Sequence, residues 1–210
     1  MPSCTRPAFD ILAPLYDTGV CFLFRLVGSE KRLRGLTINA LDIKEGDNIL
    51  EVCCGTGTLA LMAEEKGAKS FGIDISMGML KTAKKKSAGR NQKADFILAN
   101  AESVPFKKGS FDKTVVSMGL HEMPLDAVKN TIHEIKRVLK DGSKFVIFDY
   151  HKPEGFIKLL QRIFFVFTEH KTARDFIAFA IEKEMRDAGF KNFRKEILAK
   201  GALQLITCEI

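Results

Sequence analysis

The amino-acid sequence predicts an α/β fold, in which a mostly parallel sheet is covered by helices. Between residues 48 and 150, short apolar strands alternate with segments of helical periodicity, as in parallel strands joined by right-handed crossovers. Near the end of the chain a two-residue link, Lys200-Gly201, permits only an antiparallel hairpin. A length of 210 residues suits one well-cored domain of this kind.

Residues 1–45 precede the first strand and are predicted to form a helical lid or cap, ahead of a main domain at 46–210. Their apolar stretches indicate one or two amphipathic helices. These helices either pack over the sheet or close a cleft. A third interpretation is contact with a membrane surface through Phe22, Phe24 and Leu26.

The first strand and the turn after it lie within residues 48–60. The strand is built from apolar residues suited to burial on both faces, Ile49, Leu50 and Val52. Gly55 and Gly57 then allow backbone angles that a side chain would forbid. A helix follows from Leu59, with Thr58 as its expected cap. The turn therefore opens a cleft at the carboxyl end of this strand, where open α/β sheets bind ligands.

The remaining elements follow in alternation. Further strands are predicted at residues 70–74, 94–99, 113–118 and 144–150, and helices at 59–66, 76–87 and 126–139. A last helix runs into Met185–Phe190 and is followed by strands at 193–199 and 202–208, which the two-residue link joins into the hairpin. Seven strands are expected in all.

Composition excludes several classes of protein. The net charge of +7 is spread along the chain, and the one basic run, Lys84-Lys85-Lys86, falls at a predicted helix end, where lysines are solvated. No apolar run is long enough to span a membrane, and the first residues do not show the pattern of a secretion signal, so secretion is not expected. Five cysteines without a CxxC pair predict neither a metal site nor a disulfide framework, but reduced thiols in the cytoplasm.

Polar residues follow three consecutive strands. Gly55-Thr-Gly-Thr-Leu-Ala60 fits the dinucleotide pattern G-x-G-x-x-G/A, and Asp74 lies where a ribose-binding acid is expected. Glu51, however, is unfavourable beside a pyrophosphate and favourable beside an ammonium or sulfonium group. Residues 100–102 supply a third polar position, suited to a purine edge. Together the three positions match S-adenosylmethionine, with its methionyl, ribose and adenine parts.

Ordered motifs resemble those of the class I S-adenosylmethionine-dependent methyltransferases. They are Glu51-Val-Cys-Cys-Gly-Thr-Gly-Thr, Phe71-Gly-Ile-Asp-Ile-Ser-Met-Gly-Met-Leu, Asn100-Ala-Glu-Ser-Val-Pro-Phe, Gly109-Ser-Phe-Asp and Met185-Arg-Asp-Ala-Gly-Phe. The match covers about residues 9–210, and residues 9–17 resemble most the branch that contains ubiquinone- and menaquinone-biosynthesis C-methyltransferases. The resemblance implies a Rossmann-like seven-stranded sheet with an antiparallel C-terminal hairpin, helices on both faces and an N-terminal lid.

The resemblance also implies which residues bind the cofactor. These are Tyr16, Glu51, Gly55, Thr56, Gly57, Asp74, Ile75, Met79, Asn100, Ala101, Glu102, Ser117 and Met118. Asp74 would accept hydrogen bonds from both ribose hydroxyls, and Ile75 and Met79 would sandwich the adenine. The family usually carries Asp where this chain has Asn100, so the contact to adenine lacks a charge here.

On the acceptor side, the candidates follow the fourth and fifth strands. His121 is the favoured catalytic residue because histidine titrates near neutral pH and could take a proton. Tyr150, after the fifth strand, is the second candidate. Glu122, beside His121, and His151, beside Tyr150, are the other acceptor-side residues considered. The alternative for His121 is a structural hydrogen bond at a helix start. No metal is expected.

The sequence therefore predicts in-line methyl transfer from S-adenosylmethionine to a small, lipophilic acceptor. Two alternatives stay open at this point, a nicotinamide-dependent oxidoreductase and a cofactor-binding regulatory module. Nucleic acid is disfavoured as a partner, since the charge is not concentrated and no Asn/Asp-Pro-Pro-Tyr-type loop follows the fourth strand. No acceptor atom and no oligomeric state are predicted.

Overall fold

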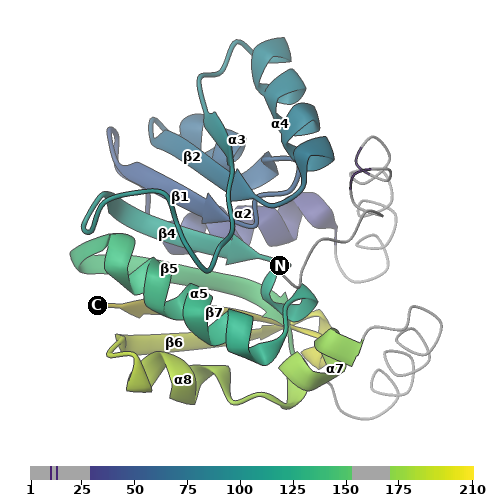
Figure 1. Ribbon diagram of the computed structural model, residues 1–210, viewed down its shortest axis with the longest axis vertical. Helices are drawn as coiled ribbons and strands as arrows, with labels where there is room; N and C mark the ends of the chain where they lie inside the picture. Colours follow the sequence, from purple (N-terminus) through teal and green to yellow (C-terminus); the bar gives the residue numbers. More distant parts are fainter. Residues whose placement is uncertain (1–9, 11–12, 14–28, 153–170) are drawn as a thin grey trace.

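The computed structural model describes residues 10, 13, 29–152 and 171–210 (Figure 1). These residues form a seven-stranded sheet of order β3-β2-β1-β4-β5-β7-β6. Its strands are β1 (Asn48–Val52), β2 (Lys69–Asp74), β3 (Asp95–Leu98), β4 (Phe111–Ser117), β5 (Leu139–Tyr150), β6 (Lys191–Leu198) and β7 (Leu203–Glu209). β1 to β5 are parallel, and β7 runs antiparallel to both β5 and β6. The predicted fold class is confirmed.

Helices cover both faces of this sheet. They are α2 (Glu30–Leu41), α3 (Thr58–Glu64), α4 (Met77–Gly89), α5 (Leu125–Val138), α7 (Lys171–Ala178) and α8 (Ile181–Asp187), with 3-10 turns η1 (Leu120–Glu122) and η2 (Ala199–Gly201). Figure 1 shows α5 and α8 in front of the sheet and α2 behind it. The strands therefore lie between two helical layers, which explains their nearly continuous apolar runs.

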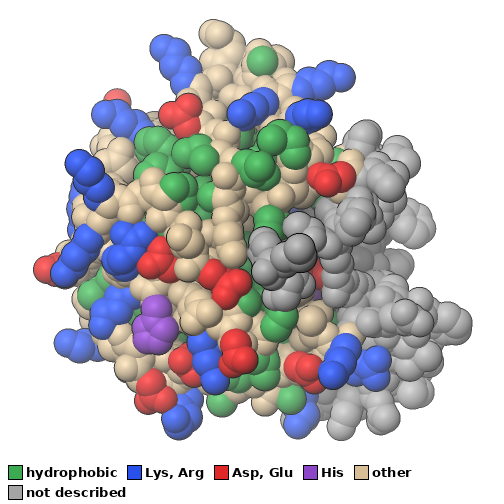
Figure 2. Space-filling view, viewed as in Figure 1, with side chains coloured by type: hydrophobic (Ala, Val, Ile, Leu, Met, Phe, Trp, Pro, Cys, Tyr) green, Lys and Arg blue, Asp and Glu red, His purple; other side chains and the backbone are tan. Residues whose placement is uncertain are grey.

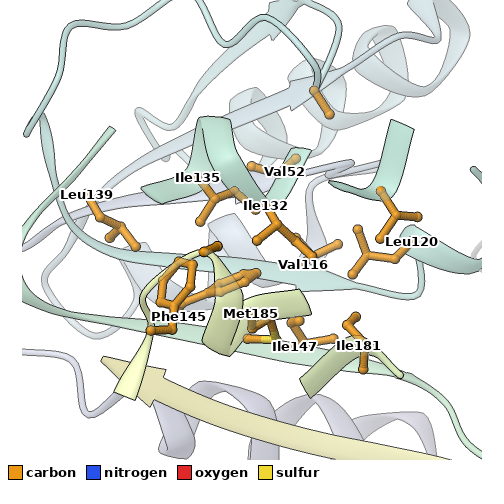
Figure 3. Close-up of a cluster of buried hydrophobic side chains, with 14 of the residues drawn as sticks. Val52, Val116, Leu120, Ile132, Ile135, Leu139, Phe145, Ile147, Ile181 and Met185 are labelled. Atoms are coloured by element: carbon orange, nitrogen blue, oxygen red, sulfur yellow. The ribbon is translucent and has the colours of Figure 1, made fainter. Parts of the chain in front are cut away.

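Alternate side chains of the central strands enter two separate cores. Those clustered with α5 and α8 include Val116, Ile147 and Ile206. Those clustered with α2 and α3 include Val115, Val146 and Leu205. Figure 3 shows the first core, where Ile132 and Ile135 of α5 and Met185 of α8 lie against the strands. The period of two along each strand thus places one residue in each core.

The largest difference from the predicted boundaries lies between α5 and β5. α5 ends at Val138, and Leu139 is already extended, with φ −75° and ψ 145°. β5 therefore begins at Leu139, five residues before the predicted start, because its first residue pairs with Phe111 of β4. The register then shifts between Phe111 and Lys113. A bulge of this kind leaves no periodic signal in the sequence.

Most of the predicted N-terminal lid, including Tyr16, Phe22, Phe24 and Leu26, lies outside the described residues. Its described helix, α2, packs on the sheet, since Leu33, Ile38 and Leu41 are buried in the core that contains Ile49 and Phe148. Residues 30–41 are thus an integral layer of the main domain. Within the described part of the chain, no helix is long and apolar enough to cross a membrane.

Candidate active site

The carboxyl ends of β1 to β5 lie along one edge of the sheet, and Asp74 joins two of them. At the end of β2, its Oδ2 accepts a hydrogen bond from the Gly55 N–H at 2.8 Å. Its Oδ1 accepts one from the Ser76 N–H, also at 2.8 Å. Burial raises the pKa of Asp74, while the N–H groups of Ser76 and Gly55 oppose the rise. The side chain is still partly exposed, so its remaining lone pairs are open to a ligand.

The two glycines of the turn face different surroundings. Gly55 has φ +52°, and a Cβ built on it would meet nothing within 4 Å. Gly57 has φ +70°, and a Cβ there would overlap the ring of Phe96 and lie 3.1 Å from the Cβ of Ala83. Gly57 therefore allows close packing inside the protein, whereas Gly55 leaves room where a cofactor would lie. This open space is the observation that fits the predicted cofactor.

Glu51 caps a helix from inside the sheet. It is only 2% exposed, and its Oε2 accepts a hydrogen bond from the Ala60 N–H in the first turn of α3 at 2.8 Å. Burial raises the pKa of Glu51 to about 7, against the effect of this hydrogen bond. The expected Thr58 cap is wrong, because α3 already begins at Thr58 and its N-cap, Gly57, has no side chain. A carboxylate from the neighbouring strand does this work instead.

Lys86 is not the solvated helix-end lysine that the basic run predicts. Its Nζ donates to Thr58 Oγ1 at 2.8 Å and to Thr56 Oγ1 at 3.1 Å. It thus ties α4 to the turn between β1 and α3. Thr56 is buried, so its hydroxyl is committed to this contact in the structure.

The turn after β2 carries the residues expected at the adenine. Ser76 is the N-cap of α4, and its Oγ accepts a hydrogen bond from the Met79 N–H at 3.2 Å. Ile75 is half-buried between the two, and Met79 is buried. One serine therefore sets the geometry of the segment that leads from Asp74 into α4.

The third polar position is held by the adjacent helix. Asn100 Oδ1 accepts from the Glu102 N–H at 3.0 Å. Glu102 Oε2 accepts in turn from Asn130 Nδ2 of α5 at 2.9 Å. Ala101 between them is buried. Asn100 and Ala101 thus lie on a fixed turn after β3, and Glu102 braces that turn against α5.

The loops after β1 and β4 meet at the same edge. Cys53 and Met118 are non-glycine residues with φ of +58° and +55°, a conformation that costs about 1–2 kcal/mol each. The Met118 N–H donates to the Phe148 carbonyl at 2.7 Å. A Cβ on Gly119 would lie 2.6 Å from the Cβ of Cys53. Ser117 and Met118 therefore end β4 in a strained turn against the glycine loop.

His121 lies between two carboxylates. Its Nδ1 is 2.6 Å from Asp149 Oδ1, and its Nε2 is 3.3 Å from Glu122 Oε1. His121 is 6% exposed and Asp149 is 0% exposed. Burial alone would lower the pKa of His121, but Asp149 and then Glu122 raise it to about 9. The imidazole is therefore protonated at neutral pH, with both nitrogens donating, which does not suit the role of a base.

Asp149 holds the ends of β4 and β5 together. Besides His121, its carboxylate accepts from the Leu120 N–H at 3.0 Å and from the Tyr150 N–H at 2.7 Å. The Tyr150 ring lies against the His121 ring, with centroids 4.4 Å apart. His151 turns away, because its Nδ1 donates to the Gly201 carbonyl at 3.1 Å. Of the acceptor-side candidates, His121, Glu122 and Tyr150 are therefore brought together.

Asp149 and Ser76 are absent from the residues predicted from sequence. An acidic residue at the end of an apolar strand, Phe-Val-Ile-Phe-Asp149, is a signal that reasoning from loops overlooks, because such a carboxylate must find partners when buried. The sequence places Ser76 only at the start of the helix predicted at residues 76–87. Its contact with Asp74 could not be read from the sequence.

Cys54, in the turn after β1, has a buried thiol. Cys54 is buried beside Gly72, and burial raises the pKa of its thiol well above the ordinary value. Among the residues that the structure describes, no group of His, Cys, Asp and Glu could hold a metal ion.

Figure 2 shows the Lys and Arg side chains on the α5 face scattered among acidic ones, without a basic patch.

Known proteins resemble this chain in sequence. Residues 49–142 match the family described as "Methyltransferase domain". An uncharacterised methyltransferase of Synechocystis sp. is 33% identical over 181 residues, which are 86% of this chain and 84% of that protein.

Two further relatives act on quinones by name. The demethylmenaquinone methyltransferase of Paenarthrobacter aurescens is 33% identical over 152 residues, 72% of this chain and 57% of its own length. The 2-phytyl-1,4-naphtoquinone methyltransferase of Trichormus variabilis is 31% identical over 155 residues, 71% of this chain and 66% of its own. The chain thus spans less than two thirds of these two relatives.

Solved structures share the fold at low identity. A SAM-dependent methyltransferase from Aquifex aeolicus has a TM-score of 0.67 at 18% identity, covering 84% of this chain and 89% of its own. The cyclase SpnF has a TM-score of 0.71, also at 18% identity, covering 97% and 93%. Since one neighbour is named a cyclase, the fold alone does not decide the reaction.

Proposed function

Because the chain belongs to the class I S-adenosylmethionine-dependent methyltransferases, we propose that it methylates a small, lipophilic acceptor of the quinone type. Its methyl donor is S-adenosylmethionine. The nicotinamide-dependent alternative is wrong, since the matching family and relatives are methyltransferases. For the same reason the regulatory module is not retained.

The observation that carries the cofactor part of the proposal is the arrangement around Asp74. Its carboxylate is fixed by two backbone N–H groups, those of Gly55 and Ser76, and remains partly exposed beside the open space at Gly55. A carboxylate held in this way has its remaining lone pairs pre-oriented for two neighbouring hydroxyls. We therefore assign it to the ribose, with Ile75 and Met79 toward the adenine and Asn100 at the ring edge.

The cofactor supplies a methyl group activated on a positively charged sulfur, which the acceptor takes in one in-line displacement. The chain must bind and align both molecules and exclude water. Glu51 buries a carboxylate along this edge and so favours a positive charge near β1. Ser117 and Met118 follow β4, where we place the methionyl end.

On the acceptor side, we assign His121 to positioning rather than to proton removal. Both of its nitrogens face carboxylates, and the pKa of His121, raised to about 9 by Asp149 and Glu122 against the effect of burial, leaves no free basic nitrogen at neutral pH. The half-buried Tyr150 ring packed on it offers a flat surface for a planar aromatic acceptor. An electron-rich quinol ring carbon can accept the methyl group and then release its own proton.

The place and partners of the protein belong to the same proposal. Buried thiols at Cys54 and Cys208 support a reducing compartment, the cytoplasm. Scattered surface charge supports a small molecule rather than nucleic acid as partner. A lipophilic quinol would be taken from a membrane surface, to which the net charge of +7 gives a weak attraction.

The test uses S-adenosylmethionine with a deuterated methyl group and reduced 1,4-naphthoquinones carrying a prenyl or phytyl chain. Mass spectrometry should detect the labelled methyl on a quinol with an unsubstituted ring carbon. A matched quinol already methylated at that carbon should stay unlabelled, and labelling there would instead indicate a hydroxyl acceptor. Label appearing only in another class of metabolite, from a cell extract, would refute the quinone proposal.

Asp74→Ala provides the control for the site. Removing the carboxylate should lower the affinity for S-adenosylhomocysteine, measured by calorimetry, by about tenfold or more, since hydrogen bonds to a charged group are lost. Unchanged affinity would show that the ribose lies elsewhere.

A further inference from the structure

Asp10 of the N-terminal region lies on the first turn of α4. Its Oδ1 accepts a hydrogen bond from Ser76 Oγ at 2.7 Å and another from the Gly78 N–H at 2.8 Å, across 66 and 68 residues of sequence. The backbones also touch, because a Cβ on Gly78 would lie 2.6 Å from the Asp10 carbonyl oxygen and 2.7 Å from its Cα. This contact therefore depends on a glycine at position 78.

Ser76 connects Asp10 to the cofactor residues. Its hydroxyl donates to Asp10 and accepts from the Met79 N–H, while its own N–H donates to Asp74. Asp74, Ile75 and Met79, which we assign to the adenosine, all lie on the turn that this serine holds. Asp10 is thus linked through a single residue, Ser76, to the turn on which these proposed adenosine contacts lie.

The electrostatics of the turn favour Asp10 in this place. The N-terminus of α4, a helix of 13 residues, carries a partial positive charge and N–H groups that have no partner within the helix. The hydrogen bonds from Ser76 and then Gly78 lower the pKa of Asp10, so the carboxylate is ionised at neutral pH. Its charge also contributes to the raised pKa of Asp74, so any help to the cofactor comes through geometry rather than through added attraction.

We propose that Asp10 is a positioning residue for the adenosine part of the cofactor, acting through Ser76. The inference rests on the proposed role of Asp74. Without Asp10, the Ser76 hydroxyl and the Gly78 N–H lose their acceptor, and the turn samples other conformations. A ligand must then order the turn as it binds, which lowers its affinity.

The first experiment compares Asp10→Ala with the wild type by calorimetry, using two probes. S-Adenosylhomocysteine and 5′-methylthioadenosine share the adenosine, but only the first carries the amino-acid end. The affinity for both probes should fall by about three- to tenfold, the size expected for losing a carboxylate at a helix N-terminus. An equal loss for both probes is the signature of an adenosine-side effect. A loss confined to S-adenosylhomocysteine would overturn the assignment.

The second experiment uses two glycines of the same helix. Gly78→Ala places a methyl group against the Asp10 backbone, whereas Gly89→Ala meets nothing within 4 Å. Both changes favour helix, so folding is preserved in each. Gly78→Ala should lower the affinity for both probes as Asp10→Ala does, and Gly89→Ala should leave both affinities unchanged. Equal behaviour of the two glycine variants would contradict the proposal.

The outcomes separate this inference from the proposed function. If Asp74→Ala loses affinity and Asp10→Ala does not, Asp10 is only a structural contact, and the cofactor site stands. If Asp10→Ala lowers the melting temperature but leaves both affinities unchanged, the positioning role is likewise refuted. If Asp74→Ala itself has no effect, the site assignment fails and this inference fails with it.

Discussion

His121 and Asp149 form a buried ion pair in which neither side chain can relax into water. The distance of 2.6 Å and the near-complete burial of both groups make the charge of each depend on the other. Removing one partner leaves an uncompensated buried charge, which costs about 3–5 kcal/mol. The pair therefore connects the ends of β4 and β5 through electrostatics as well as through backbone hydrogen bonds.

The pH dependence of stability should reveal this pair. The pKa of His121 is raised to about 9 by Asp149 and Glu122, which overcome burial, from an ordinary value of 6.5. A raised folded-state pKa gives stability that is fully present below pH 6.5 and is lost as pH rises through about 9. At pH 6.5, His121→Gln should be less stable than wild type by on the order of 3 kcal/mol, and the gap should narrow toward pH 9.5.

Urea unfolding across this pH range measures the gap. The exposed His133 of α5 supplies the control, since His133→Gln should track the wild type at every pH. Parallel curves for His121→Gln and wild type would mean that the imidazole is not charged in the folded state.

The Glu51 side chain affects stability in two ways, through its buried charge and through its hydrogen bond to the Ala60 N–H. Its pKa is raised to about 7 by burial, so the stability linked to its protonation is present below pH 4.5 and is lost as pH rises through about 7. Glu51→Gln keeps an oxygen for the Ala60 N–H and should be at least as stable as wild type at pH 8. Glu51→Ala removes the cap and should lose about 1–2 kcal/mol. Guanidinium unfolding of the wild type and both variants at pH 8 measures the two differences in stability.

The charge of Glu51 should also appear in cofactor binding. S-Adenosylmethionine carries a sulfonium charge that S-adenosylhomocysteine lacks. Glu51→Gln should therefore weaken S-adenosylmethionine severalfold more than S-adenosylhomocysteine, in calorimetry at pH 8. Equal losses would leave Glu51 with its capping role alone.

At the scale of the element, the loop between β1 and α3 shows how two similar glycines differ. Both have positive φ, so replacing either by alanine costs about 1 kcal/mol of backbone strain. Gly57→Ala also drives a methyl group into Phe96 and should destabilise the protein by about 2–4 kcal/mol in total. Gly55→Ala should cost little more than the strain and should mainly weaken cofactor binding. Urea unfolding and calorimetry on both variants test this contrast, and equal destabilisation would contradict it.

α5 holds the segment after β3, which we propose lies beside the adenine. Its Arg137 donates to the carbonyls of Val104 and Phe106, both at 2.8 Å, and pairs with Glu134. Glu134 accepts in return from the Val104 N–H at 2.8 Å. Side chains of α5 therefore anchor the backbone of the segment after β3, and α5 is itself fixed in the core.

At the scale of the whole molecule, the core under α5 and α8 joins the parallel strands to the antiparallel hairpin. Phe145 of β5 is fully buried there and lies against Phe190, with ring centroids 5.4 Å apart. Phe145→Ala should destabilise the protein by about 3–5 kcal/mol. Ile197→Ala on β6, where the side chain is 49% exposed, should cost less than about 1 kcal/mol. Chemical denaturation measures both, and a small loss for Phe145→Ala would mean that the hairpin is not part of the same cooperative unit.

The order of elements, and the sheet edge to which we assign the cofactor, could be predicted because their signals are local. Periodicity of two or about 3.6 identifies strands and helices, and Gly55, Asp74 and Asn100 each lie at the end of a strand or shortly after it. Boundaries failed where tertiary pairing extends an element, as in β5, whose start at Leu139 depends on Phe111 of a different strand.

The sequence by itself therefore determined the fold class, the three polar positions and the class of cofactor, since each depends on residue type and short spacing. Only the tertiary structure decided that His121 is held charged by Asp149, that Glu51 caps α3, and that Gly57 faces the interior. It also decided that Asp10 reaches Ser76. These are contacts between residues distant along the chain or on different elements. They depend on strand register and packing, which no local pattern encodes.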